Sequence, residues 1–384
     1  MKLRDIWPRV GACVSVALIA WLARVSPLLA NVLVRVNVTE APRLTVGSST
    51  AARILDSSGQ ILDEVDAMTS LAAIAVGNDI QIGEVQGNRL MLQPATTDGS
   101  IFINDTWYRG TIEIVSTGDR LMAINHVDLE VYVASVIGSE MGGQFPLEAL
   151  KSQAVATRTF ALYNHNKRLN QPFDVGDDSR WQVYKGIAAE TSNTAMAAQQ
   201  TTGQVLTHNG QLINAVYHAD SGGATENSEH VWSSPLPYLK AVSDRQWVPS
   251  RPWEKQFSAQ EVQREFVGIG SVTAMEVEAR SPQGRVRQVR ITGSEGSVVL
   301  TGKDFRQRLQ LRSTMFEVEP GGPIQTASTQ PVAVPPSFIV KGYGYGHGVG
   351  MSQWGAAELA KRNWTHEQIL QFYYKDIGLS RITE

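Results

Sequence analysis

Three glycine-flanked side chains in this 384-residue chain could carry catalysis. Glu140 comes just before Gly142 and Gly143, Ser221 precedes two more glycines, and His347 lies where every second residue from 342 to 350 is glycine. Because glycine lets backbone and neighbouring side chains approach closely, each of these groups could reach a cleft. One rigidly held carboxyl group can act as a general acid and then as a general base, which is the chemistry that Glu140 could supply.

Other common active-site patterns do not fit these residues. A dinucleotide site needs G-x-G-x-x-G, and its third glycine would fall on His347, Val349 or Met351. A serine-hydrolase elbow needs G-x-S-x-G, but Ala219 stands where the first glycine before Ser221 should be. The formal net charge of -3 gives no electrostatic reason to expect a nucleic-acid partner. We therefore expect neither a nucleotide site nor nucleic-acid binding.

Metal and cofactor binding are not expected either. The one cysteine, Cys13, lies in the N-terminal apolar segment, and neither His218 nor His347 belongs to an H-E-x-x-H motif. Both histidines are interpreted as structural or substrate-bonding groups. Tryptophans could stack on sugar rings, although most tryptophans belong to hydrophobic cores. The tryptophans noted for this role are Trp232, Trp247, Trp253 and Trp354.

Helical periodicity flanks Glu140 on both sides. Asp128 is a suitable N-cap for a first helix, and Gly138 fits the end of that helix. Pro146 suits the start of a second helix. Lys151 and Arg158 are seven residues apart and lie on the same face of this helix. The pattern predicts that Glu140 lies in a break between two helices, which would hold it rigidly.

Further elements are predicted around the two histidines. Asn209-Gly210 between apolar runs is a strong hairpin signal, and the second hairpin strand is expected to carry His218. Residues 338–340 predict a strand that leads into the glycine-rich run, and a helix follows from about Ser352. Thr365 and Gln368 form a capping box that predicts the start of the last helix.

The first thirty residues predict export. Lys2, Arg4 and Arg9 form a basic region before the apolar run 10–23, as in a secretory signal. A cleaved signal peptide and an uncleaved membrane anchor both remain open for residues 1–30. We expect an exported protein of the periplasm or cell envelope.

The rest of the chain is predicted to be α+β. Short apolar runs separated by glycine and aspartate predict a β-rich N-terminal part over residues 31–125. Residues 126–384 are predicted to form the catalytic core, with a helical catalytic segment and a glycine-rich strand-to-helix C-terminal segment. A loop rich in Pro, Gly, Ser and Thr is predicted near 320–336.

Four blocks of sequence resemble the SpoIID/LytB family, the family of stage II sporulation protein D and its relatives. The blocks are residues 136–141 (VIGSEM), 148–159 (EALKSQAVATRT), 217–232 (YHADSGGATENSEHVW) and 344–356 (GYGHGVGMSQWGA). Their order and separation also match the family, and the last block is the most specific. The resemblance covers nearly all of the chain after the export signal.

The resemblance implies action on bacterial peptidoglycan, and it places the family's catalytic glutamate on Glu140. Some members bind zinc through Cys and His near the block around Ser221, but this chain has no cysteine there. The family often has proline after the Glu-Met pair, where this chain has Gly142. The predicted substrate-binding residues, taken from the same blocks, are Lys151, Arg158, His218, Ser221, Gly222, Glu226, His347, Ser352 and Gln353.

Three functions remain open, the first two of which are implied by family members. A lytic transglycosylase cleaves the glycan strand between MurNAc and GlcNAc with one glutamate and leaves 1,6-anhydro ends. A non-catalytic wall-binding protein would instead enhance a cell-wall amidase. An ordinary glycosidase would need a second carboxylate, for which Asp220, Glu226 and Glu229 are candidates. The first function requires a protonated Glu140, and a cation such as Lys151 close to it would work against that state.

Overall fold

The computed structural model describes residues 32–232, 234–249, 251–321 and 337–382. The predicted export signal lies outside the described residues, and so does nearly all of the predicted loop near 320–336. Helices and strands both contribute many elements, so the predicted α+β class is confirmed. No described helix has both the length and the apolar character needed to cross a membrane.

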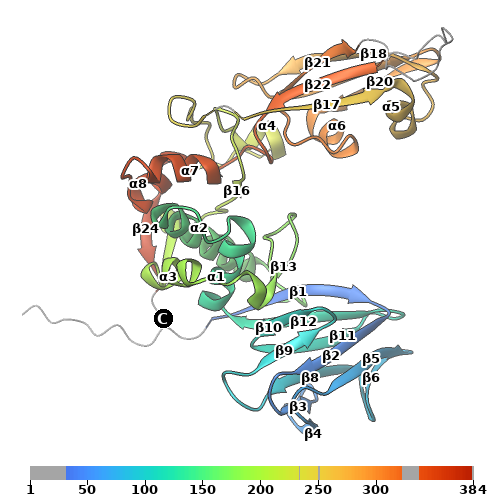
Figure 1. Ribbon diagram of the computed structural model, residues 1–384, viewed down its shortest axis with the longest axis vertical. Coiled ribbons are helices and arrows are strands. Elements are labelled where there is room, and N and C mark those ends of the chain that lie inside the picture. Colours follow the sequence, from blue (N-terminus) through green and yellow to red (C-terminus); the bar gives the residue numbers. More distant parts are fainter. Residues whose placement is uncertain (1–31, 233, 250, 322–336, 383–384) are drawn as a thin grey trace, which may run out of the picture.

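Two antiparallel sheets form the N-terminal part, at the end of the molecule shown in blue in Figure 1. One has the strand order β13-β1-β12-β11-β8-β3-β4 and the other the order β10-β9-β2-β5-β6-β7; only β13 pairs in parallel, with β1. Alternation along β1 buries Val34 and Val36 and leaves Arg35 partly exposed. The strands are β1 (Leu33–Ala41), β2 (Arg43–Ser48), β3 (Ala52–Leu55), β4 (Ile61–Val65), β5 (Ser70–Val76), β6 (Asp79–Ile82), β7 (Val85–Gly87), β8 (Arg89–Pro94), β9 (Ser100–Ile103), β10 (Thr106–Arg109), β11 (Thr111–Ser116), β12 (Leu121–Asp128) and β13 (Val175–Gly176).

Helices α1 (Leu129–Glu140), α2 (Leu147–Lys167) and α3 (Ser192–Gln200), with the short 3-10 helix η1 (Gly186–Ala189), pack together beside these sheets. The Asp128 carboxylate caps α1 as predicted, because it accepts hydrogen bonds from the backbone N–H groups of Glu130 and Val131. The predicted helix stop at Gly138 is wrong, because α1 continues to Glu140. Gly138 is instead a packing residue, since an added Cβ would lie 1.8 Å from the Ala189 carbonyl oxygen of η1.

The C-terminal elements complete this main core. The hairpin at Asn209-Gly210 is confirmed between β14 (Gln204–His208) and β15 (Gln211–Leu212), with positive φ at both turn residues. Its second strand stops at Leu212, so the prediction that this strand carries His218 is wrong. His218 belongs to β16 (Tyr217–His218), which pairs in parallel with β23 (Met351–Ser352). The remaining elements of this part are α4 (Ser228–Trp232), α7 (Gln353–Ala360), α8 (His366–Tyr373) and β24 (Gly378–Arg381).

A second hydrophobic core lies between α4 and β23 in the sequence. We call residues 252–343 the accessory domain; Figure 1 places it at the opposite end of the molecule from the N-terminal sheets. Its buried residues, among them Val262, Phe305 and Val340, form a cluster separate from the main core. Its elements are β17 (Pro252–Ser258), α5 (Ala259–Glu265), β18 (Val272–Arg280), β19 (Val286–Gly293), β20 (Gly296–Thr301), α6 (Gly302–Arg308), β21 (Phe316–Gly321) and β22 (Ser337–Tyr343).

Candidate active site

Glu140 is the last residue of α1, and three segments distant in sequence donate hydrogen bonds to its carboxylate. The Val183 backbone N–H donates to Oε1 over 2.9 Å, and the Tyr217 hydroxyl donates to the same oxygen over 3.5 Å. Gln353 Nε2 donates to Oε2 over 3.4 Å. The structure therefore brings Gln353, a predicted substrate-binding residue, into contact with the predicted catalytic residue.

The surroundings of Glu140 favour its neutral, acidic form. Burial raises the pKa of Glu140, and the hydrogen bonds from Val183, Gln353 and Tyr217 oppose this effect only in part. The cation considered in the sequence, Lys151, does not contact Glu140, because its ammonium group pairs with Glu148 over 2.6 Å. A carboxyl group with a raised pKa is suited to donate a proton near neutral pH.

A buried polar network holds the Tyr217 hydroxyl in place. Gln182 Nε2 donates to the Tyr217 oxygen over 3.0 Å, and the Tyr132 hydroxyl donates to Gln182 Oε1 over 3.0 Å. Burial raises the pKa of both phenols well above its usual value, so both stay protonated and remain donors. Sequence reasoning missed this network. Tyr217 lies beside His218 in a family-like block, which was a usable signal, whereas a backbone N–H such as that of Val183 gives none.

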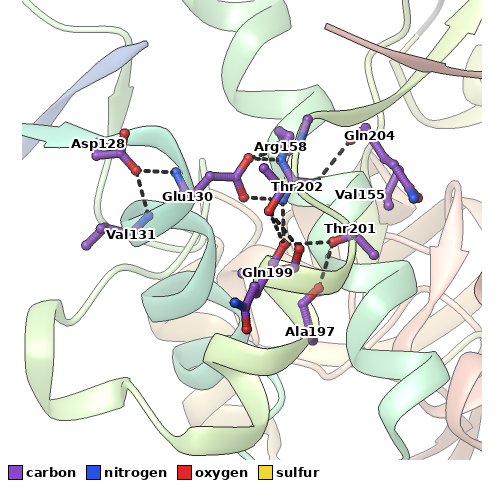
Figure 2. Close-up of polar contacts among 12 residues, drawn as sticks. Asp128, Glu130, Val131, Val155, Arg158, Ala197, Gln199, Thr201, Thr202 and Gln204 are labelled. Atoms are coloured by element: carbon purple, nitrogen blue, oxygen red, sulfur yellow. Dashed lines mark hydrogen bonds and ion pairs between the residues drawn. The ribbon is translucent and has the colours of Figure 1, made fainter. Parts of the chain in front are cut away.

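Arg158 does not belong to this site. Figure 2 shows its guanidinium paired with the Glu130 carboxylate of α1. Nε donates to Glu130 over 2.8 Å, and another nitrogen donates to the Gln204 carbonyl over 3.1 Å. The side chain has no exposed surface. The predicted substrate contact of Arg158 is therefore replaced by a structural role, in which the buried cation ties α1, α2 and β14 together.

Ser221 and Ser352 hold backbone segments together. Ser221 Oγ donates to Asp244 over 2.7 Å, and the Ser352 hydroxyl accepts from the Ser221 backbone N–H over 3.2 Å and from Gly355 over 3.1 Å. Gly222 adopts a φ of +73°, which suits its place in the tight turn between these contacts. All three predicted residues thus pack the β16–β23 region, and Ser221 and Ser352 are fully buried.

His218 and His347 lie side by side, with ring centroids 5.5 Å apart. His218 Nδ1 donates to the Val349 carbonyl over 3.1 Å, and its Nε2 is buried without a hydrogen-bond partner in the described structure. Burial lowers the pKa of His218 well below its usual value and that of His347 to about 3, so both rings are neutral. Within the described ranges, no three His, Cys, Asp or Glu side chains are grouped around a possible metal position.

The carboxylates considered as a second catalytic group all have other partners. Glu226 is buried and accepts hydrogen bonds from His230 over 2.8 Å and from Ser281. The Glu229 carboxylate forms an ion pair with Lys240, and the Asp220 carboxylate accepts a hydrogen bond from the Gly222 backbone N–H. None of the three forms a hydrogen bond with Glu140 or with its donors in the part of the chain that the structure describes.

One tryptophan noted in the sequence is the residue next to a donor to Glu140. Trp354 follows Gln353 directly and is 37% exposed. Its ring centroid is 4.9 Å from that of Phe145, and the Arg251 guanidinium lies 4.1 Å above it. Trp253, in contrast, is buried and donates to the Gly344 carbonyl. Trp354 is thus an exposed aromatic side chain one residue away from a donor to Glu140.

Two family models match this chain, each over a different range of residues. The family model described as stage II sporulation protein matches residues 117–208, and a domain of unknown function (DUF8618) matches residues 251–350. Stage II sporulation protein D of Bacillus subtilis is 34% identical over 67% of this chain and 76% of its own length. The amidase enhancer of the same organism is 29% identical over 77% of this chain and 47% of its own length. An uncharacterized protein of Brachyspira hyodysenteriae is 29% identical over 82% of this chain and 84% of its own.

Proposed function

The chain belongs to the SpoIID/LytB family and has a function related to the cell wall, and on this premise we propose that it is a lytic transglycosylase of peptidoglycan. One observation supports this choice above the others. Glu140 has a raised pKa and three hydrogen-bond donors, and among the described residues no second carboxylate is hydrogen-bonded to it. A transglycosylase needs one such group, which can act first as the acid and then as the base. Most glycoside hydrolases use a second carboxylate about 5–9.5 Å away, so the products of the reaction distinguish the two.

In the proposed reaction, Glu140 first protonates the oxygen of the glycosidic bond between MurNAc and GlcNAc. The carboxylate left behind accepts hydrogen bonds from Val183, Tyr217 and Gln353, which stabilise its charge. The same carboxylate then takes the proton of the MurNAc C6 hydroxyl as that oxygen attacks C1 of its own sugar. No water is consumed, and the product carries a 1,6-anhydro end.

The rest of the proposal concerns where the substrate lies. We assign Trp354 and Phe145 to apolar contact with a pyranose ring. Peptidoglycan lies outside the cytoplasm, so the proposed function places the protein in the periplasm or cell envelope after export through residues 1–30. The glycan strand is the proposed partner, and no metal or cofactor takes part.

A second function is favoured by one of the relatives. The name amidase enhancer belongs to a protein that matches 77% of this chain, so we keep enhancement of a cell-wall amidase as the alternative. In that case the protein would bind wall material, leave glycan bonds intact and work without Glu140.

Product mass on peptide-free glycan strands distinguishes these functions. The purified protein is incubated with the strands, and the fragments are analysed by mass spectrometry. Anhydro ends support transglycosylation, reducing ends indicate a hydrolase, and intact strands overturn both. If strands stay intact, a purified amidase is added, and a faster amidase reaction with wild type and with Glu140→Gln alike supports the enhancer function.

A further inference from the structure

The accessory domain contacts the region of the candidate site at several points, among them Trp253, which donates to the Gly344 carbonyl, and Arg312, whose carbonyl accepts from the Gly346 N–H. The turn between β18 and β19 makes a further set of contacts there. Arg285 ends this turn, and one of its terminal nitrogens donates to the Ser221 carbonyl over 2.5 Å and to the Ala224 carbonyl over 3.2 Å. Ser281, at the start of the turn, donates its hydroxyl to the Glu226 carboxylate. The turn therefore binds the segment that follows β16 at three points.

The same arginine lies against the segment that precedes β23. A Cβ added to Gly348 would lie 2.3 Å from Cζ of Arg285, so the glycine backbone packs directly on the guanidinium group. The Gly348 carbonyl in turn accepts a hydrogen bond from the Glu226 N–H over 2.7 Å. Arg285 is thus held between two segments of the main core, one after β16 and one before β23.

Both side-chain donors to Glu140 lie on or directly beside the strands β16 and β23. Tyr217 lies on β16 and pairs with Met351 of β23, and Gln353 directly follows β23. The hydroxyl of Tyr217 and the amide of Gln353 reach the carboxylate over 3.5 and 3.4 Å, which are long hydrogen bonds. A small shift of β16 or β23 would break them, so the positions of these strands decide two of the three hydrogen bonds to Glu140.

Stability alone does not explain the arginine. Arg285 is 2% exposed, and its Nε and one terminal nitrogen have no hydrogen-bond partner in the described structure. Burial lowers its pKa to about 10, and the carboxylates of Glu226, Asp244 and Asp220 oppose that effect, so it stays charged at neutral pH. Buried charges with unsatisfied donors cost free energy, and apolar replacements of similar volume are often neutral or stabilising.

We propose that Arg285 is a positioning residue through which the accessory domain fixes β16 against β23, and with them the Tyr217 and Gln353 donors to Glu140. In this proposal the accessory domain, which lies within the match to the domain of unknown function, helps to hold the active site in place. The catalytic consequence rests on the proposed transglycosylase function, whereas the structural consequence does not.

The test compares Arg285→Met with Arg287→Met, a matched control. Arg287 lies two residues further along, on β19, and is exposed. Amide hydrogen exchange is measured by mass spectrometry on peptides that cover residues 214–222 and 344–353. We expect roughly 10-fold faster exchange there in Arg285→Met and no change in Arg287→Met or in β1 peptides. Arg285→Lys, which keeps the positive charge and hydrogen-bond donors on a single nitrogen, should keep part of the protection. Unchanged exchange in Arg285→Met overturns the proposal.

Two further measurements separate positioning from folding. The pKa of Glu140, followed by NMR of labelled glutamate carboxyl groups, should rise further in Arg285→Met, because two donors to the carboxylate are loosened. On glycan strands, kcat should fall about 10-fold to 100-fold with little change in KM. If wild type does not cleave strands, the proposed function fails, but exchange and the Glu140 pKa still decide the role of Arg285. If Arg285→Met does not fold, Ser281→Ala and Arg285→Lys replace it, and unchanged exchange in both overturns the proposal.

Discussion

At the scale of single residues, Glu140 carries the proposed chemistry. Glu140→Gln keeps the shape of the side chain and an acceptor for the Val183 N–H, but it can neither give nor take the catalytic proton. We expect the rate of release of anhydro-ended fragments to fall by about 10²–10⁴. Circular dichroism checks the fold, and Glu229→Gln, which removes a carboxylate paired with Lys240, is the matched control. Near-normal cleavage by folded Glu140→Gln would assign the chemistry to another group.

The same substitution makes a prediction about stability. Burial raises the pKa of Glu140 in the folded protein, so the unfolded chain loses this proton at lower pH than the folded protein does. The stability linked to the neutral carboxyl is complete below the unfolded pKa and is lost as pH rises through the folded pKa. Glu140→Gln has no such proton to lose.

Thermal unfolding at several pH values measures this linkage. The Tm of Glu140→Gln should exceed that of wild type at pH 7–8, and the difference should shrink as pH falls to about 4, near the usual glutamate pKa. A Tm difference that is the same at both ends of this range would show that the pKa of Glu140 is not raised.

Metal removal is expected to leave the protein unchanged. His218 is buried, His347 is half-buried and both rings are uncharged, and the cationic side chains of Arg285 and Arg306 act electrostatically on both. Nearby positive charges disfavour a metal cation. Cleavage rate and Tm are measured before and after incubation with a chelator. Loss of either that zinc alone restores would show that these histidines are ligands.

Sequence reasoning located part of this site. The family resemblance singled out Glu140 and Gln353, which contact each other in the structure. It also singled out Arg158, which is buried against Glu130. An ion pair within the scaffold and a substrate contact look alike in sequence, because both use a charged residue at a fixed place in a motif. The donors Tyr217 and Val183 depend on long-range packing, and the sequence pattern did not reveal them.

At the scale of elements, local signals failed where tertiary packing decides. Asn209-Gly210 specifies a tight turn through its own φ angles, so the hairpin was predictable. The pairing of His218 with Ser352 joins residues 134 positions apart and leaves no local signal. Gly138 suggested the end of a helix, yet it allows α1 to pass η1 at close distance.

Gly138→Ala tests the packing explanation. In an exposed helix alanine would stabilise by about 1 kcal/mol relative to glycine. Here the new methyl group would meet the Ala189 carbonyl oxygen at 1.8 Å, and overpacking of this kind costs roughly 1–3 kcal/mol. We therefore expect a net loss in the free energy of unfolding, measured by urea titration. Gly296→Ala is the control, because nothing lies within 4 Å of its added methyl group. A more stable Gly138→Ala would contradict the packing explanation.

At the scale of the whole molecule, the β16–β23 pair belongs to the main core, and the accessory domain contacts the segments beside it through side chains such as Arg285. The main core holds Glu140 through α1, and the accessory core holds the turn that ends in Arg285. If this division is correct, weakening the accessory core should disturb the site while the main core stays folded. Phe305 is the residue to change, because it is fully buried. Its ring centroid lies 5.4 Å from that of Phe316 and 6.4 Å from that of Phe266.

Phe305→Ala leaves a cavity that costs about 3–5 kcal/mol, and this loss falls on the accessory domain alone. Calorimetry should therefore resolve two transitions, the first of which exposes buried Trp253 and changes its fluorescence. Cleavage activity should disappear with this first transition, because Arg285 then leaves Ser221 and Gly348 although α1 is still folded. Phe305→Leu, with a smaller cavity, should lower the first transition less. A single cooperative transition would mean that the two cores unfold as one, and activity that survives the first transition would show that the site does not need the accessory domain.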